Sequence, residues 1–459
     1  MNRVFLLALV APALLGCAPA LAADNDLKAL RDEIAQMKAH HANRLAELEA
    51  RLAKAEKAAS DAASSSRRAQ ESARRATDRP AAFNPGISAV LNGTYARLSR
   101  DPGSYSIGGF MPSGDEIGPP PRSFGLGESE IGLSANIDTL FRGQLTFALA
   151  PDGGGEVEEA YIQTLALGNG MKLTAGRFLS GLGYLNAQHA HTWDFTDAPL
   201  AYAAFFGGPL RNDGIQFKLV APTDLLLEFG AELASGGPFP STDRNRNGSG
   251  LGVVYAHIGG DLGNAHSWRA GVSLLQTSPS DRAYTEADAS GADVTRSFSG
   301  RSRTWVIDGI WKWAPQGNAT ARSLTIQGEY FRRRETGTLG YETTGTQLSG
   351  DYASTQSGYY AQAVYRFMPR WRIGYRFDRL DAGTPAIGLV DSGMLAASDF
   401  ASLGGRRPRR NTLMLDWSPT EFSRLRLQLA RDRSRPDVID NQLWLQYIVS
   451  LGAHGAHRF

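Results

Sequence analysis

The sequence predicts an all-β fold, a sixteen-stranded antiparallel transmembrane β-barrel, preceded by a periplasmic α-helical coiled coil. From residue 87 onwards, apolar and polar residues alternate over long stretches, which is typical of strands with one lipid face and one wet face. Before residue 80, apolar residues instead recur every third or fourth position, as in a coiled coil. The chain therefore divides into a signal peptide at 1–22, a coiled coil at 23–79, a linker at 80–86 and the barrel at 87–459.

The composition excludes several classes of protein. The 459 residues include 48 Lys and Arg, 46 Asp and Glu, and 1 Cys. The resulting net charge of +2 lacks the basic excess of chains that coat nucleic acid. A single cysteine forms neither a disulfide framework nor a cysteine-based zinc site. We expect no nucleic-acid partner and no cofactor.

The first 22 residues read as an export signal. A short basic start is followed by an apolar run at 4–15, and Ala20-Leu21-Ala22 fits a small-x-small cleavage site. The apolar run is too short to cross a membrane as a helix. Leu14 to Cys17 also resembles a lipoprotein box, which would place a lipid on Cys17. We favour ordinary cleavage, because the downstream site is good and a barrel needs no lipid anchor.

The segment 23–79 has the apolar spacing of a coiled coil. Two heptad frames are joined by a four-residue stutter through His41. Their seam residues are Leu27, Leu30, Ile34, Met37, Leu45, Leu48 and Leu52. Two interpretations stay open, a single solvated amphipathic helix and a parallel oligomeric coiled coil. Pro80 and Asn84-Pro85-Gly86 end the helix and form a linker.

The alternating part of the chain accommodates sixteen strands. Connections after the even-numbered predicted strands are short, and the others are mostly long. This is the topology of outer-membrane barrels, and it places the start of the first strand and the end of the last strand on the periplasmic side. The terminal Phe459 is typical of chains that the barrel-insertion machinery recognises. The strands are expected near 86–98, 123–137, 140–150, 156–166, 171–178, 211–221, 224–234, 250–259, 266–276, 301–313, 319–333, 357–367, 371–380, 409–418, 421–432 and 440–452.

The connection at 179–210 is the candidate constriction of the pore. A loop of this length is functional or disordered, and it contains Trp193, Phe195, Tyr202, Phe205 and Phe206, too many aromatic residues for disorder. We therefore expect it to fold into the barrel. The alternative is an extracellular cap.

Charges on the predicted interior face are unevenly distributed. Residues 123–234 hold 13 acidic and 5 basic residues, whereas residues 357–432 hold 12 Arg and 7 acidic residues. Opposite walls of opposite charge would orient polar solutes, and arginine ladders attract anions such as phosphate. The predicted acidic wall is Glu128, Glu130, Glu159, Glu228 and Glu232. The predicted basic wall is Arg366, Arg372, Arg376, Arg424 and Arg426. The alternative is that these charges only keep the interior wet.

Three short segments resemble a known family. They are Glu158-Glu159-Ala160-Tyr161, Ala175-Gly176-Arg177-Phe178 and the run from Gly374 to Leu380. With the signal peptide and coiled coil, they resemble Gram-negative porins related to the phosphate-selective porins O and P. The resemblance implies a homotrimeric barrel that passes small hydrophilic solutes passively, with an anion (phosphate-like) preference. The loop 179–210 has no Lys or Arg, so a basic clamp on that loop is absent.

Histidines suggest a second interpretation. His189, His191 and Asp194 are close in sequence and are residue types that hold zinc or another divalent metal. The C-terminus adds His454 and His457, which topology places at the other end of the barrel. These segments resemble outer-membrane proteins of zinc uptake, so the alternative function is uptake of divalent metal or a metal chelate. The other interpretation is that these residues are simple polar histidines of a loop.

Sequence motifs bear on two other classes of function. The sequence contains no Gly-x-Ser-x-Gly elbow and no His-Glu-x-x-His motif, so we expect no enzyme. A second alternative is a tether, in which the coiled coil contacts peptidoglycan and the barrel is its anchor. Outer-membrane lipids and lipopolysaccharide are expected partners, because Arg332 to Arg334 and Arg406 to Arg410 lie near predicted extracellular loops.

Overall fold

The computed structural model describes residues 31–32, 34–50, 53, 57, 85–112, 117–149, 154–242, 247–288 and 291–452. The chain forms two units, residues 1–82 and 83–459. In the first unit the described residues are helical and exposed, including the seam residues Ile34, Met37, Leu45 and Leu48. The signal peptide, Cys17, His454 and most of the linker lie outside the described residues, and the oligomeric coiled coil stays a prediction. Among the described residues, no helix is both long and apolar enough to cross a membrane.

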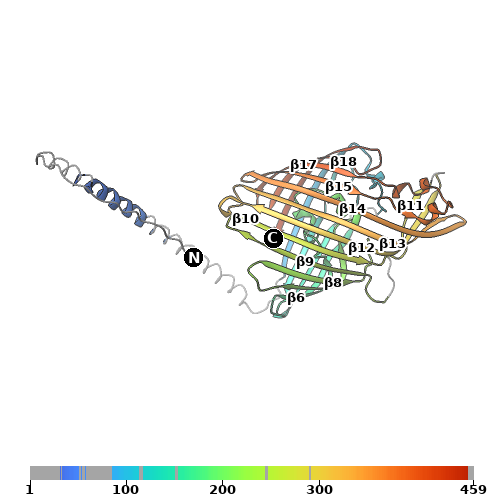
Figure 1. Ribbon diagram of the computed structural model, residues 1–459, viewed down its shortest axis with the longest axis horizontal. Helices are drawn as coiled ribbons and strands as arrows, with labels where there is room; N and C mark the ends of the chain where they lie inside the picture. The colour runs from blue at the N-terminus through green and yellow to red at the C-terminus, as the bar shows by residue number, and fades with distance from the viewer. Residues whose placement is uncertain are drawn as a thin grey trace, which may run out of the picture. The chain divides into compact units, whose positions relative to one another are not determined.

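The second unit is a closed antiparallel barrel (Figure 1). Nineteen described strands are hydrogen-bonded into one sheet. β2 and β3 are two parts of one barrel strand, while β11 and β16 only pair onto β12 and β14. Sixteen strands therefore surround the barrel within the described residues, as predicted. The first and last strands close it, with Ser88 opposite Gly452 and Leu98 opposite Gln442.

The strands have the following bounds. They are β1 (Gly86–Leu98), β2 (Ser123–Leu126), β3 (Ser129–Asn136), β4 (Phe141–Leu149), β5 (Gly155–Thr164), β6 (Met171–Leu179), β7 (Arg211–Val220), β8 (Leu226–Ala234), β9 (Leu251–Leu262), β10 (His266–Thr277), β11 (Arg282–Ala287), β12 (Asp293–Trp313), β13 (Ser323–Thr343), β14 (Thr346–Met368), β15 (Trp371–Asp381), β16 (Ala386–Ile387), β17 (Arg409–Thr420), β18 (Ser423–Arg433) and β19 (Asp440–Gly452). Short helical segments are η1 (Pro102–Ser104), η3 (Leu185–Ala187), η4 (Ala190–Thr192), α2 (Leu200–Phe206), η5 (Pro315–Gly317), α3 (Gly388–Asp391) and η6 (Ala397–Leu403).

Alternation along each strand separates an apolar exterior from a mainly polar interior. In β12, Trp305 and Ile307 are 47% and 57% exposed, whereas Thr304 and Asp308 are 1% and 3% exposed. The exposed side chains are the ones that the hydrocarbon of a bilayer would cover. Closure of the sheet pairs the strand edges, so the backbone polar groups need no water at that depth.

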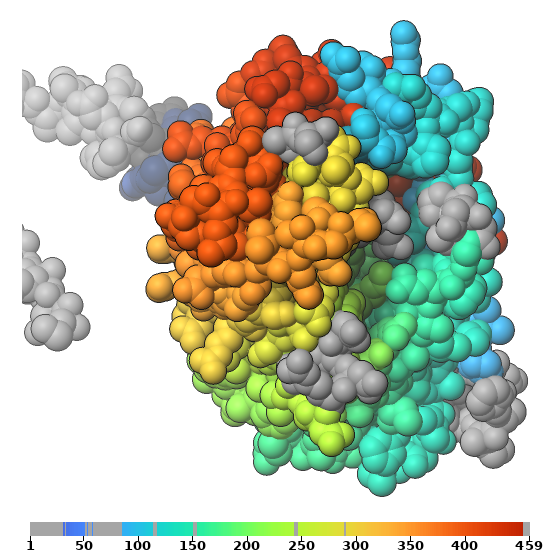
Figure 2. All heavy atoms as spheres, turned by 90° about the vertical axis from the view of Figure 1, so that its right-hand side faces the viewer, coloured from blue at the N-terminus to red at the C-terminus, as the bar shows by residue number. Residues whose placement is uncertain are grey.

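The two ends of the barrel differ. At one end, which we call the turn end, connections are short, as at 137–140, 263–265, 369–370 and 421–422. At the other end, the loop end, the connections 99–122, 180–210, 235–250 and 382–408 are long. Figure 2 shows the loop end, where several of these segments crowd the opening.

Three strands are longer than the sequence predicted. The predicted strands at 301–313, 319–333 and 357–367 are β12, β13 and β14, which extend past the loop end (Figure 1). The extensions are rich in threonine, serine and glycine and contain few apolar residues. The periodicity of apolar residues therefore did not reveal them. They are held by a second apolar cluster that includes Phe298, Leu339, Tyr352 and Phe400.

Candidate functional site

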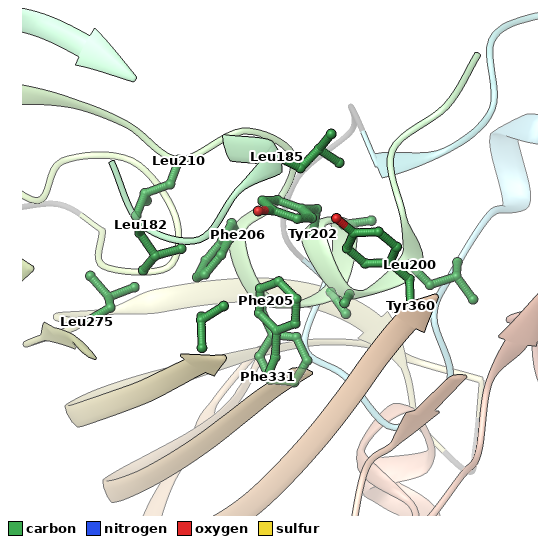
Figure 3. Close-up of a cluster of buried hydrophobic side chains, with 14 of the residues drawn as sticks. Leu182, Leu185, Leu200, Tyr202, Phe205, Phe206, Leu210, Leu275, Phe331 and Tyr360 are labelled. Carbon is green, nitrogen blue, oxygen red and sulfur yellow. The ribbon is translucent and has the colours of Figure 1, made fainter. Parts of the chain in front are cut away.

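The connection between β6 and β7, residues 180–210, folds into the barrel (Figure 3). We call it the inward loop. From its helix α2, Tyr202, Phe205 and Phe206 surround Phe331 of β13, with ring centroids 5.2, 5.6 and 5.7 Å away. Interior residues of other strands also belong to this cluster, among them Leu275, Val306 and Tyr360. This is the arrangement that the aromatic content of the loop predicted.

Buried polar groups fix the start of the inward loop. The carboxylate of Glu329 accepts hydrogen bonds from the backbone N–H groups of Tyr184 and Leu185, at 3.2 and 2.8 Å. The hydroxyl of Tyr202 donates to the same carboxylate at 2.8 Å. Asn186 joins the two ends of the loop, because its amide donates to the carbonyls of Ser180 and Leu210, at 2.9 and 3.0 Å. The loop is therefore a fixed part of the interior.

A bulge in β5 turns two successive glutamates inward. The register between β4 and β5 shifts after the Thr146–Glu159 pair, and Val157 is the next residue paired. Glu158 is thus left outside the ladder. A regular strand would send Glu158 and Glu159 to opposite faces, but both are buried here.

Two histidines of the inward loop meet these glutamates. His189 Nδ1 lies 3.0 Å from Glu158 Oε2 and 3.3 Å from Glu130 Oε2. Its Nε2 lies 3.1 Å from Glu159 Oε2. His191 Nδ1 lies 2.7 Å from Glu130 Oε1. We call these five residues the carboxylate–histidine cluster. Burial opposes charge on His189, but its hydrogen bonds to the three glutamates outweigh burial and raise the pKa of His189 well above its usual range.

The inward loop meets arginines on the opposite side. Asp194 pairs with Arg372 at 2.7 Å. Asp197 pairs with Arg376 at 3.0 Å and with Arg410 at 2.6 Å. Burial raises the pKa of Asp197, but the two arginines outweigh it and hold the pKa below the usual range.

The carbonyl of Trp193 adds a further contact on this side. It accepts hydrogen bonds from Arg424 and Arg426, at 3.3 and 2.7 Å. The inward loop is therefore held between acidic strands on one side and basic strands on the other.

The structure places all ten predicted wall residues on the interior side of the barrel. Glu128 and Glu130 belong to the β2–β3 strand, and Glu228 pairs with Lys218 at 3.4 Å and with His257 at 3.0 Å. Glu232 accepts hydrogen bonds from Ser180 and Gly181 at the start of the inward loop. Whether these residues select solutes remains a prediction.

The predicted metal set is corrected by the positions of its members. His189 and His191 lie in the carboxylate–histidine cluster. Asp194 does not join them, because its two oxygens contact Arg372 and Gln362. Sequence proximity misplaced it, since the loop turns after Trp193 toward the basic side. The described group close enough to share one ion is instead Glu130, Glu158 and His189.

Basic residues also form a belt around the interior, which the charge counts of separate sequence segments did not reveal. Near the turn end, seven interior positions carry a positive side chain: Lys172, Lys218, Arg269, Lys312, Arg366, Arg372 and Arg424. They come from seven strands, so the belt extends well beyond the predicted basic wall. Acidic neighbours of the belt include Asp194, Glu228, Asp308 and Asp416. The belt therefore gathers positive side chains from seven strands near one end of the barrel.

A cavity of about 430 Å³ remains beside the inward loop. Its lining includes groups of both signs: Glu128, Glu156, Glu158, Asp197, Arg211 and Arg410. Tyr105 also lines it from the connection after β1. Burial and the nearby Asp432 raise the pKa of Tyr105 far above its usual range, so this phenol stays neutral. A space of this size admits water and small polar solutes.

The chain resembles known proteins in sequence and in structure. No protein-family model matches the chain. It is 29% identical to an uncharacterized protein of Aquifex aeolicus over 363 residues, which cover 74% of this chain and 70% of that protein. It resembles the solved structure of a loop-deletion mutant of the Vibrio cholerae outer membrane protein OmpT, with 11% identity and a TM-score of 0.49, over 80% of this chain and 99% of that one.

Two further solved structures are similar to the same degree. The anion-selective porin from Comamonas acidovorans has 10% identity and a TM-score of 0.48, over 80% of this chain and 99% of that one. The outer membrane channel DcaP of Acinetobacter baumannii has 11% identity and a TM-score of 0.47, over 80% of this chain and 97% of that one.

Proposed function

We propose that this chain is an outer-membrane porin that lets small hydrophilic solutes diffuse passively, with a preference for anions. The closed barrel, its apolar exterior and its charged interior are the features that support a water-filled pore in lipid. The inward loop narrows this pore and leaves a cavity of about 430 Å³ beside it. No step of this proposal requires a cofactor or a catalytic residue.

The basic belt is the observation that carries the anion preference. A ring of positive groups at one end of a pore lowers the energy of anions and raises that of cations. Arg366 is the most informative member, because among the described residues it makes no hydrogen bond or ion pair and its Nε is buried without a partner. The inward loop carries no Lys or Arg, so we propose a general anion preference rather than a specific phosphate clamp.

The test is the reversal potential of single channels under a salt gradient. Exchange of Arg366→Glu together with Arg424→Glu should shift the permeability ratio toward cations several-fold. Arg372 and Arg376 are less suitable, since their ion pairs with Asp194 and Asp197 hold the inward loop. Arg424 contacts the loop at the carbonyl of Trp193, at 3.3 Å, but Arg426 also holds this carbonyl at 2.7 Å and is left unchanged. The matched control is Arg332→Glu with Arg334→Glu, two exposed arginines on the exterior face, which should leave the ratio unchanged. An unchanged ratio in the belt variant would remove the belt from the mechanism.

An exterior arginine patch supports contact with the phosphates of lipopolysaccharide. Arg303 of β12 and Arg334 of β13 are directly opposite each other on the exterior, where like charges are unfavourable unless an anion lies between them. Arg301 and Arg332 lie beside them, and all four are exposed. The patch lies next to Trp305 and toward the loop end, where the outer leaflet is expected.

Assembly follows as part of the same proposal. The barrel begins and ends at the turn end, at Gly86 and Gly452, which supports a periplasmic position for the N-terminal helix. Exposed seam residues of that helix, such as Met37 and Leu45, need a partner helix to be buried. We propose a homotrimer that is joined in part by this coiled coil, and a coiled coil that contacts peptidoglycan.

A further inference from the structure

We propose that the carboxylate–histidine cluster binds a divalent metal ion of the zinc type, with His189, Glu130 and Glu158 as ligands. The site lies where the inward loop meets β3 and β5. The inference goes beyond passive diffusion and does not rest on it, because the cluster would bind metal whether or not the barrel conducts.

The spacing of the donor atoms suits one ion. One ligand atom from each of Glu130, Glu158 and His189 lies within 4.8 Å of the others. His189 Nδ1 is 3.0 Å from Glu158 Oε2 and 3.3 Å from Glu130 Oε2. Tetrahedral zinc with ligands at about 2.1 Å holds them roughly 3.4 Å apart. The two distances from His189 Nδ1 are therefore within about half an ångström of the spacing that zinc requires.

Neighbouring groups orient the ligands as in known metal sites. The two nitrogens of His189 have different partners, because Nε2 faces Glu159 at 3.1 Å while Nδ1 faces the other two glutamates. A proton on Nε2 that is donated to Glu159 leaves the lone pair of Nδ1 for the metal. His191 holds the second oxygen of Glu130 at 2.7 Å. Glu159 and His191 are thus positioning residues.

The charge of the cluster also calls for a cation. Glu130, Glu158 and Glu159 are 5%, 1% and 9% exposed, and Glu128 repels two of them. Two histidines cannot balance the three carboxylates of the cluster even when both are protonated. Burying uncompensated charge is costly, and a divalent ion supplies the missing positive charge.

The composition and access of the site narrow the kind of metal. One imidazole with two carboxylates suits zinc and similar transition metals better than calcium or magnesium, which prefer oxygen ligands alone. Glu158 and Ala190 line the cavity beside the inward loop, so an ion can reach the site from the interior. A fourth position would remain open on that side for water or an anion.

The experiment is zinc binding to the purified full-length chain in detergent, after removal of metal with a chelator. Equilibrium dialysis should give one zinc bound through this cluster per chain. The exchange Glu159→Gln should weaken binding by about 10- to 100-fold, the usual effect of losing an orienting partner. His189→Gln and Glu158→Gln should weaken it more. X-ray absorption of the zinc-loaded protein should show one imidazole among oxygen ligands.

Two control variants locate the site. His266 is stacked on Trp311 at the turn end, and His266→Gln should leave zinc binding unchanged. The exchange His454→Ala with His457→Ala removes the C-terminal histidines and should also have no effect on the cluster. Wild-type affinity in His189→Gln and Glu158→Gln, or no zinc bound by the wild type, would overturn the proposal. If His189→Gln does not fold, judged by heat-modifiable migration, Glu159→Gln and the absorption spectrum decide the question.

Discussion

The inward loop is anchored on two sides of the barrel, and the two anchors have different chemistry. On the basic side, Asp197 lies between Arg376 and Arg410, at 3.0 and 2.6 Å. Those arginines also have Asp378 and Asp432 within 4 Å. On the acidic side, His189 and His191 lie against the buried carboxylates of Glu130, Glu158 and Glu159. The basic anchor is nearly balanced by permanent charges, whereas the acidic anchor depends on a proton or a metal ion.

This difference assigns separate roles to the two sides. Arginine–aspartate pairs keep their charges over the whole physiological pH range, so the basic anchor positions the loop permanently. The acidic anchor changes charge with its ligand, so it is where the state of the loop can be altered. The following predictions test this comparison, from the largest expected effect to the smallest.

The largest effect is expected for Asp197→Asn. The exchange leaves two buried arginines without one of their carboxylates, and loss of one partner of a buried pair costs on the order of 3 kcal/mol. The free energy of unfolding in urea should fall by that amount, and channel current should become noisier as the loop loosens. The control is Asp213→Asn, whose pair with Arg177 is 54% and 37% exposed and should cost less than about 1 kcal/mol. Equal losses of unfolding free energy in the two variants would contradict the stabilising role of the buried anchor.

A smaller effect of opposite sign is expected on the acidic side. Glu128→Gln removes a carboxyl group that is unfavourable next to Glu158 and Glu130 when it is charged, so in chelator it should leave stability unchanged or raise it by up to about 1 kcal/mol. Urea unfolding of the metal-free protein measures the effect. A loss as large as that of Asp197→Asn would show that the acidic anchor is not over-supplied with negative charge.

The pH dependence of the basic anchor should be weak down to acid pH. Because the pKa of Asp197 is lowered in the folded chain, its stabilising contribution is complete above the unfolded value of about 3.9 and is lost as pH falls through the lower folded value. The stability difference between wild type and Asp197→Asn should therefore stay constant from pH 7 to about 5. It should shrink only below about pH 4. A change in this stability difference between pH 7 and 5 would mean that a group other than Asp197 carries the stabilisation.

The smallest effect concerns the exterior, which should not influence the interior anchors. Arg303→Ala with Arg334→Ala removes half of the exterior arginine patch, and we expect less lipopolysaccharide to copurify, at unchanged single-channel conductance. Phosphate analysis of the purified barrel measures the first quantity. Equal lipopolysaccharide in the wild type and the variant would exclude the patch as its binding site.

Much of this fold could be predicted because it depends on a local pattern. Alternation of apolar and polar residues located sixteen strands and placed Arg372 and Glu232 on the interior. The aromatic residues of the inward loop predicted its burial. The extensions of β12–β14 were missed, because their outer parts lie beyond the apolar band and lack the pattern that marks a lipid-facing strand.

The candidate site depended on contacts that no local pattern records. Glu158 faces inward only because of the bulge in β5, and regular alternation would have assigned it to the exterior. Asp194 is two residues beyond Thr192, but the loop turns it toward Arg372 on the opposite side. The basic belt was missed because its members come from seven strands, with one or two residues in any part of the sequence. Closure of the barrel brings them together.

The most direct test of the central claim is single-channel recording of the purified, heat-modifiable wild-type protein in planar bilayers. A porin with a basic belt should give stable stepwise currents, and the reversal potential under a salt gradient should have the sign of anion preference. Folded protein that inserts and carries no current would contradict the pore, and steps with cation preference would contradict the role of the belt.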